Sequence, residues 1–103
     1  MLDSAWVYIL TNKNNTTLYI GVTNDLSARL SEHKKKQNPT AFTARYNLFK
    51  LVYYQGFTTL EEAIEMEGYI KGKSRRWKMD LINTLNPTWK DLADDIAAQD
   101  DDR

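Results

Sequence analysis

Two tyrosines lie eleven residues apart, each inside a short run rich in β-branched and aromatic residues. Tyr8 falls within residues 6–10 and Tyr19 within residues 18–22, and an Asn-rich polar stretch separates the runs. This pattern predicts a β-hairpin. Either tyrosine could be an ordinary strand residue, because strand side chains alternate between the two faces of a sheet. The predicted hairpin would also present the two phenolic oxygens near one sheet surface.

The segment after the second tyrosine predicts a helix over residues 25–36. On it, Arg29 and His33 are four residues apart and share a face with Leu26 and Leu30. The arginine could extend its charge to solvent and the histidine could be hydrogen-bonded at the helix surface. The same pair would also suit phosphate binding and proton transfer.

A second helix, predicted over residues 59–71, places Glu67 close to the centre of its apolar stripe. The residues expected to form that stripe are Leu60, Ala63, Ile64 and Ile70. A carboxylate in such a position is costly unless it is paired or bound to a metal ion. Glu67 is therefore the acidic residue most suited to a functional role.

Two clusters of basic residues follow these helices. The first contains Lys34, Lys35 and Lys36, and the second contains Lys71, Lys73, Arg75, Arg76 and Lys78. Such clusters are commonly solvated surface. They also supply the contacts to phosphate that make nucleic-acid binding independent of sequence.

The formal net charge of zero hides an uneven distribution. Residues 91–103 hold six Asp and one Arg, which leaves a net charge of +5 on residues 1–90. We expect one domain over residues 1–92 and an acidic, frayed tail over residues 93–103. The tail could simply aid solubility, or it could compete with nucleic acid for the basic surface.

The composition is typical of a small globular domain without disulfides. The 103 residues include no cysteine, so disulfides and thiolate metal sites are excluded. No apolar run reaches the length of a membrane span, and no signal-peptide pattern is present. We expect a cytoplasmic protein without membrane contact, and favour a monomer.

The coarse pattern predicts an α+β fold, in which helices flank a small antiparallel sheet. The expected strands are residues 5–11, 17–22 and 49–55, and the expected helices are residues 25–36, 59–71 and 75–85, with a short helix from about Trp89. The pattern alone does not fix the place of the third strand.

The order of these residues resembles the GIY-YIG nuclease superfamily, and specifically its small single-domain members. The resemblance runs from Trp6 to about Leu92. It rests on Val7-Tyr8-Ile9 and Tyr19-Ile20-Gly21, on Arg29 with His33, on Glu67 within its helix, and on Asn86-Pro87-x-Trp89. The first triplet departs from Gly-Ile-Tyr, and Val22 stands where some relatives have a lysine.

The resemblance implies a sheet of order 2-1-3 and a catalytic set of Tyr8, Tyr19, Arg29, His33 and Glu67. It implies that one tyrosine activates the attacking water, with Tyr8 preferred, and that Arg29 binds the scissile phosphate. Glu67 would hold one divalent ion, Mg²⁺ or Mn²⁺. Asn86 would bind near the metal or cap a helix.

The expected function is a metal-dependent endonuclease that cuts DNA, with branched or damaged DNA as candidate substrates and RNA still open. The nucleic-acid contacts are expected from Lys34, Lys35, Lys71, Lys73, Arg75, Arg76 and Asn86. The alternatives are a nucleic-acid-binding module with little turnover and a protein-interaction scaffold. If the protein is an enzyme, we expect all five catalytic residues to line one shallow groove.

Overall fold

The sheet has three antiparallel strands in the order β2-β1-β3, as predicted. The computed structural model describes residues 2–35, 43 and 45–96, except the side chains of residues 33–35. The strands are β1 (Ala5–Thr11), β2 (Leu18–Thr23) and β3 (Lys50–Phe57). Because β1 pairs with both neighbours, its residues are held from two sides.

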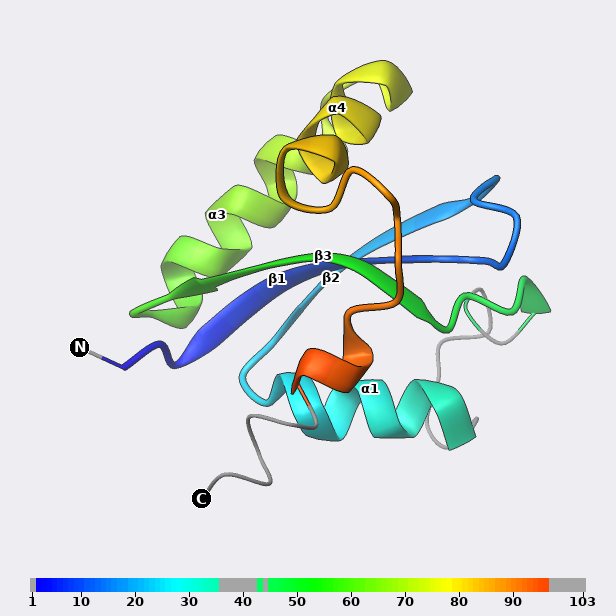
Figure 1. Ribbon diagram of the computed structural model, residues 1–103. Coiled ribbons are helices and arrows are strands. Elements are labelled where there is room, and N and C mark those ends of the chain that lie inside the picture. Colours follow the sequence, from blue (N-terminus) through cyan, green and yellow to red (C-terminus); the bar gives the residue numbers. More distant parts are fainter. Residues whose placement is uncertain (1, 36–42, 44, 97–103) are drawn as a thin grey trace.

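The helices cover both faces of this sheet (Figure 1). The longer helices of the described residues are α1 (Leu26–Lys35), α3 (Leu60–Lys71) and α4 (Arg75–Leu85). Helix α1 lies against one face, whereas α3 and α4 lie against the other (Figure 1). Among the described residues, no helix has the length and apolar character to cross a membrane.

Alternation along β1 separates the core into two parts. Val7 and Ile9 pack on the side of α3 and α4, with Ile70 and Ile82 among their partners. Tyr8 and Leu10 point to the side of α1 and pack in a cluster that includes Leu26, Leu30, Leu51, Leu92 and Ile96. Tyr8 therefore belongs to the face that carries α1.

The C-terminal segment is part of the packed domain. The backbone N–H of Leu92 donates to the carbonyl of Leu51 at 2.8 Å, and the Leu51 N–H donates to Oδ1 of Asp91 at 3.1 Å. Ala93 and Ile96 are buried beside α1. The folded region thus continues through Ile96, beyond the boundary predicted at residue 92, and residues 97–103 lie outside the described residues.

The orientation of α3 differs from the prediction. Ala63 and Ile70 are fully buried, but Leu60 and Ile64 are 45% and 51% exposed. Residues seven apart lie on one side of a helix, so the face on the sheet is centred on Ala63 and Ile70. Placing Leu60 and Ile64 in the core was therefore wrong, and Glu67 lies at the border of the buried face rather than near its centre.

The packing of the C-terminal segment can be tested with two matched substitutions. Ile96→Ala should lower the free energy of unfolding by about 2 kcal/mol or more, because it removes buried methyl groups. Ile64→Ala makes the same chemical change on an exposed helix surface and should alter that free energy by only about 0.5 kcal/mol. Urea denaturation of both variants measures the difference, and equal effects would show that Ile96 is not packed.

Candidate active site

The ring of Tyr8 lies across the neighbouring strand β2. Tyr8 is 1% exposed and is paired in register with Gly21. A Cβ atom on Gly21 would lie 2.6 Å from both Cζ and the hydroxyl oxygen of Tyr8. The phenol group occupies the space that a side chain at residue 21 would fill. Gly21 is therefore the residue that lets Tyr8 extend from the central strand across β2.

Tyr19 stands beside this ring on β2. The two ring centroids are 6.3 Å apart and their planes are inclined by 45°. Tyr19 is half-buried and packs against the same cluster as Tyr8. The hairpin thus brings the two tyrosines of the sequence pattern into one site.

Arg29 reaches the same site from α1. Its guanidinium donates a hydrogen bond to the Tyr8 phenol. Its Nε also lies 3.5 Å from a carboxylate oxygen of Glu32, and the Arg29 side chain is 40% exposed. The guanidinium therefore stands at the boundary between the buried phenol and solvent, where an anion can approach it.

Glu67 approaches from α3, on the other side of the sheet. Its side chain is 23% exposed, and its Oε2 lies 3.2 Å from Nζ of Lys71 one helical turn later. The Glu67 carboxylate is close enough to Tyr8 to act on the ionisation of the phenol. Helices from opposite faces of the sheet thus contribute to one site around Tyr8.

These surroundings change the acidity of Tyr8. Burial and then the neighbouring Tyr19 raise the pKa of Tyr8, the charge and hydrogen bond of Arg29 lower it, and Glu67 raises it, to about 12 in sum. The Tyr8 phenol is consequently protonated at neutral pH. Positive charge placed near Tyr8 would make the phenolate more accessible.

The donor set around Glu67 suits only one kind of metal site. In the part of the chain that is described, no three His, Cys, Asp or Glu residues gather in a way that could hold a metal ion. Mg²⁺ retains several waters and is commonly held by one or two carboxylates together with substrate phosphate oxygens. The single carboxylate of Glu67 fits such an ion and does not fit a closed protein cage.

The structure describes some of the other predicted site residues fully and others only by their backbone. The backbone of His33, Lys34 and Lys35 continues α1 beyond Arg29, but their side chains are outside the described part. Lys73 stacks on aromatic rings, with Nζ 4.4 Å from the Tyr69 ring centroid. The remaining basic side chains lie along α3 and α4, namely Lys71, Arg75 and Arg76, and all three are exposed.

Asn86 has a structural place. The residue is 3% exposed, and its Nδ2 donates to the carbonyls of Val52 and Lys90 at 3.2 and 2.8 Å. Its Oδ1 accepts from the Lys90 N–H. Of the two roles that the sequence left open, these hydrogen bonds favour the one at the helix end, because Asn86 is the C-cap of α4 and its amide is held by backbone groups.

Gly21 is the site residue whose role sequence reasoning missed, and two glycines allow a matched test. Gly21→Ala places a methyl group against the Tyr8 ring and should destabilise the protein by about 1–3 kcal/mol. Gly68→Ala, on exposed helix surface with no atom within 4 Å of the new Cβ, should instead stabilise it by about 0.5–1 kcal/mol. Thermal unfolding of both variants compares them; a neutral Gly21→Ala would contradict the crossing of the ring over β2.

The acidity of Tyr8 can be measured with tyrosine labelled at Cζ with ¹³C, with Tyr8→Phe for assignment. Its NMR signal should keep the shift of the neutral phenol to about pH 11, and Arg29→Ala should raise the pKa further. Folding raises the pKa of Tyr8, so the protonated phenol contributes to the free energy of unfolding. This contribution is fully present below about pH 10 and is lost as pH rises towards 12. A titration midpoint of the Tyr8 signal near pH 10 would mean that the phenol is solvated and would contradict its burial.

Comparisons with known proteins identify the family of this chain. Residues 4–80 match the family model described as the GIY-YIG catalytic domain. A UPF0213 protein of Streptococcus pneumoniae is 34% identical over 83 residues, which cover 81% of this chain and 82% of the relative. A UPF0213 protein of Clostridium perfringens is 37% identical over 79 residues, covering 77% of this chain and 83% of the relative.

A solved structure shares the fold. The solution NMR structure of a UPF0213 protein from Bacillus halodurans matches with a TM-score of 0.55 at 30% identity, and the match covers 85% of this chain and 92% of that chain. The family match spans more than half of this sequence and includes both tyrosines, Arg29 and Glu67. The chain therefore belongs to the GIY-YIG family of nuclease domains.

Proposed function

We propose that this protein is a divalent-metal-dependent endonuclease that hydrolyses phosphodiester bonds in DNA, with branched or damaged DNA as candidate substrates. One observation supports this most: the buried Tyr8 phenol crosses β2 over Gly21, accepts a hydrogen bond from Arg29 and lies under the electrostatic influence of Glu67. A phenol, a cation and a carboxylate that meet at one partly exposed place supply the groups that phosphodiester hydrolysis requires.

Arg29 is the proposed phosphate ligand. A guanidinium presents planar, permanently charged donors that match two oxygens of a phosphate. Because negative charge grows on those oxygens as water attacks, a fixed cation stabilises the transition state more than the ground state. The partial exposure of Arg29 leaves the substrate a path from solvent.

Tyr8 is the proposed group that orients and deprotonates the attacking water. With a pKa of about 12, the phenol is a poor base at neutral pH unless nearby positive charge increases. A bound divalent ion would supply that charge and would polarise the phosphate. The proton of the Tyr8 phenol would first pass to His33, which follows Arg29 by one turn of α1, and the phenolate would then accept a proton from the attacking water.

Glu67 and Lys71 are proposed to act together beside the phosphate. The ion pair at 3.2 Å orients the Glu67 carboxylate. Lys71 is 54% exposed, so its ammonium can also reach an oxygen of the DNA backbone. Lys73, Arg75, Arg76, Lys34 and Lys35 are proposed to contact the flanking phosphates.

A binding module with little turnover is the second candidate. The high pKa of Tyr8 and the engagement of Glu67 by Lys71 favour it, because both hold the site in a resting form. The two candidates differ in whether the Glu67 carboxylate is needed for chemistry.

Cleavage assays separate the candidates. Nicking of supercoiled and branched DNA with Mg²⁺ or Mn²⁺ should fall at least about 100-fold in Arg29→Ala and in Glu67→Gln. The first change removes the cation that stabilises the transition-state phosphate, and the second removes the carboxylate that would hold the metal ion. Glu65→Gln is the matched control: it removes an exposed carboxylate from the same helix and should leave the rate within about twofold.

DNA binding by Glu67→Gln should remain intact or become tighter, since a negative charge is removed from the surface that meets phosphate. Gel shifts at low salt measure this. Two results together would favour the binding module. The wild-type protein would cleave neither DNA nor RNA with either metal, and the Glu67→Gln variant would fail to fold.

A further inference from the structure

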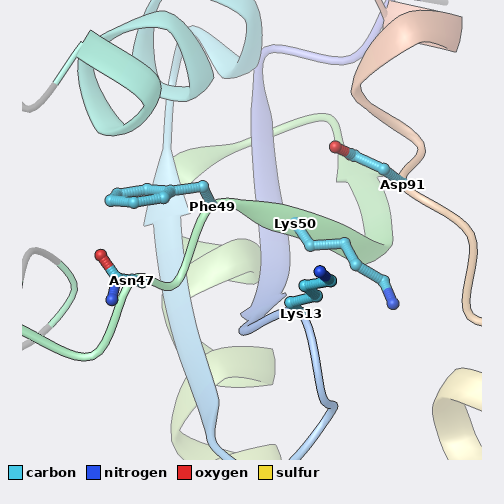
Figure 2. A pocket seen from close by; sticks show the side chains of 5 residues that line it. All are labelled: Lys13, Asn47, Phe49, Lys50 and Asp91. Atoms are coloured by element: carbon cyan, nitrogen blue, oxygen red, sulfur yellow. The ribbon is translucent and has the colours of Figure 1, made fainter.

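A pocket with no part in the proposed chemistry lies where the β1–β2 loop meets the start of β3. Its volume is about 550 Å³, and its lining residues are Lys13, Asn47, Phe49, Lys50 and Asp91 (Figure 2). They come from three separate stretches of the chain. The lining is arranged by type: Phe49 and Asn47 lie on one side, and Lys13, Lys50 and Asp91 lie on the other (Figure 2).

The cationic side is held in place by the loop residue Asn15. Its Oδ1 accepts a hydrogen bond from Nζ of Lys50 at 2.8 Å, and its carbonyl oxygen accepts one from Arg75 at 3.4 Å. Asn15 has a φ of 60°, a left-handed conformation that Asn tolerates better than most residues. These contacts fix the loop that carries Lys13, and they bring a third cation, Arg75, close to the pocket.

The one carboxylate in the lining has another task. Oδ1 of Asp91 accepts hydrogen bonds from the backbone N–H groups of Leu51 and Ala93, at 3.1 and 3.0 Å. Asp91 is therefore fixed by the backbone, and the side chains that line the pocket carry a net charge of +1. An anion would bind beside Lys13 and Lys50.

We propose that this pocket binds an unpaired nucleotide of the substrate. The base lies against the Phe49 ring with its edge near the Asn47 amide, and the phosphate lies at Lys13 and Lys50. This rests on the proposed nuclease function and names its substrate class: DNA with a single-stranded segment. A base inside a duplex is stacked on both faces and has no face to offer an aromatic ring, whereas an unpaired base does.

The position of the pocket relates it to the candidate active site. The β1–β2 hairpin carries Lys13 in its loop and Tyr8 and Tyr19 on its strands. A strand held in the pocket would therefore continue along the hairpin towards Arg29. The unpaired segment would bind at the loop end, and the scissile phosphate would lie farther along β2.

The test measures binding by the full chain carrying Glu67→Gln, which prevents cleavage. The probes are fluorescent oligo(dT) of about twelve nucleotides, within the usual footprint of single-strand sites, and a duplex of the same length. Phe49→Leu should weaken binding of oligo(dT) about tenfold, the value of one stacked base, and leave duplex affinity unchanged. Phe49→Tyr keeps the aromatic face and should retain affinity for oligo(dT).

Lysine variants test the cationic side. Lys13→Ala and Lys50→Ala should each weaken oligo(dT) binding and reduce the slope of log affinity against log salt by about 0.7. Lys90→Ala is the matched control, because Lys90 is an exposed lysine that lines a different pocket; it should leave both values unchanged. If Phe49→Leu does not fold, Lys13→Glu in the exposed loop tests the cationic side of the pocket and should weaken oligo(dT) binding.

Two results would overturn the pocket. One is unchanged oligo(dT) affinity in Phe49→Leu or, where that variant is unfolded, in Lys13→Glu. The other is an equal loss for single strand and duplex in Phe49→Leu. DNA cleavage is measured separately, in protein that retains Glu67. If the protein cleaves DNA but Phe49→Leu leaves oligo(dT) binding unchanged, the nucleotide-binding role of the pocket is refuted and the nuclease function is not. If Phe49→Leu selectively weakens oligo(dT) binding but the protein cleaves no DNA, the binding role is supported and the nuclease function is refuted.

Discussion

The candidate site depends on one steric constraint, the passage of the Tyr8 ring across β2 in the space left by Gly21. Tyr8 is rooted in the central strand, where pairing on both sides fixes its backbone. Without a side chain opposite, its phenol extends past the neighbouring strand to meet Arg29. The central strand thereby holds the Tyr8 hydroxyl in a fixed position close to solvent.

The same constraint explains why helices from opposite faces serve one site. Helix α1 covers the face to which Tyr8 points, and α3 covers the other (Figure 1). Because β2 is an edge strand, α1 and α3 can both contribute side chains near it. The cation and the carboxylate thus act on the phenol from different sides and shift its pKa in opposite directions.

The local pattern predicted the strands and the helices. The family resemblance, and not the local pattern, indicated Tyr19, Arg29 and Glu67, which act on Tyr8 in the structure. The sequence did not predict which side of α3 faces the sheet, because the stripes containing Ala63 and Ile64 are adjacent on the helix and both are apolar. The amide of Asn86 was undecided because its partner, the Val52 carbonyl, is 34 residues away. The burial of Ile96 was hidden by the acidic residues around it.

The central claim is that Tyr8 and Arg29 act as one catalytic unit. A double-mutant cycle on single-turnover DNA cleavage, with Tyr8→Phe, Arg29→Ala and the double variant, tests it most directly. The account predicts that the double variant is no slower than the slower single variant, because either change disables the same step. Losses that multiply in the double variant would show that the two residues act independently and would contradict the account.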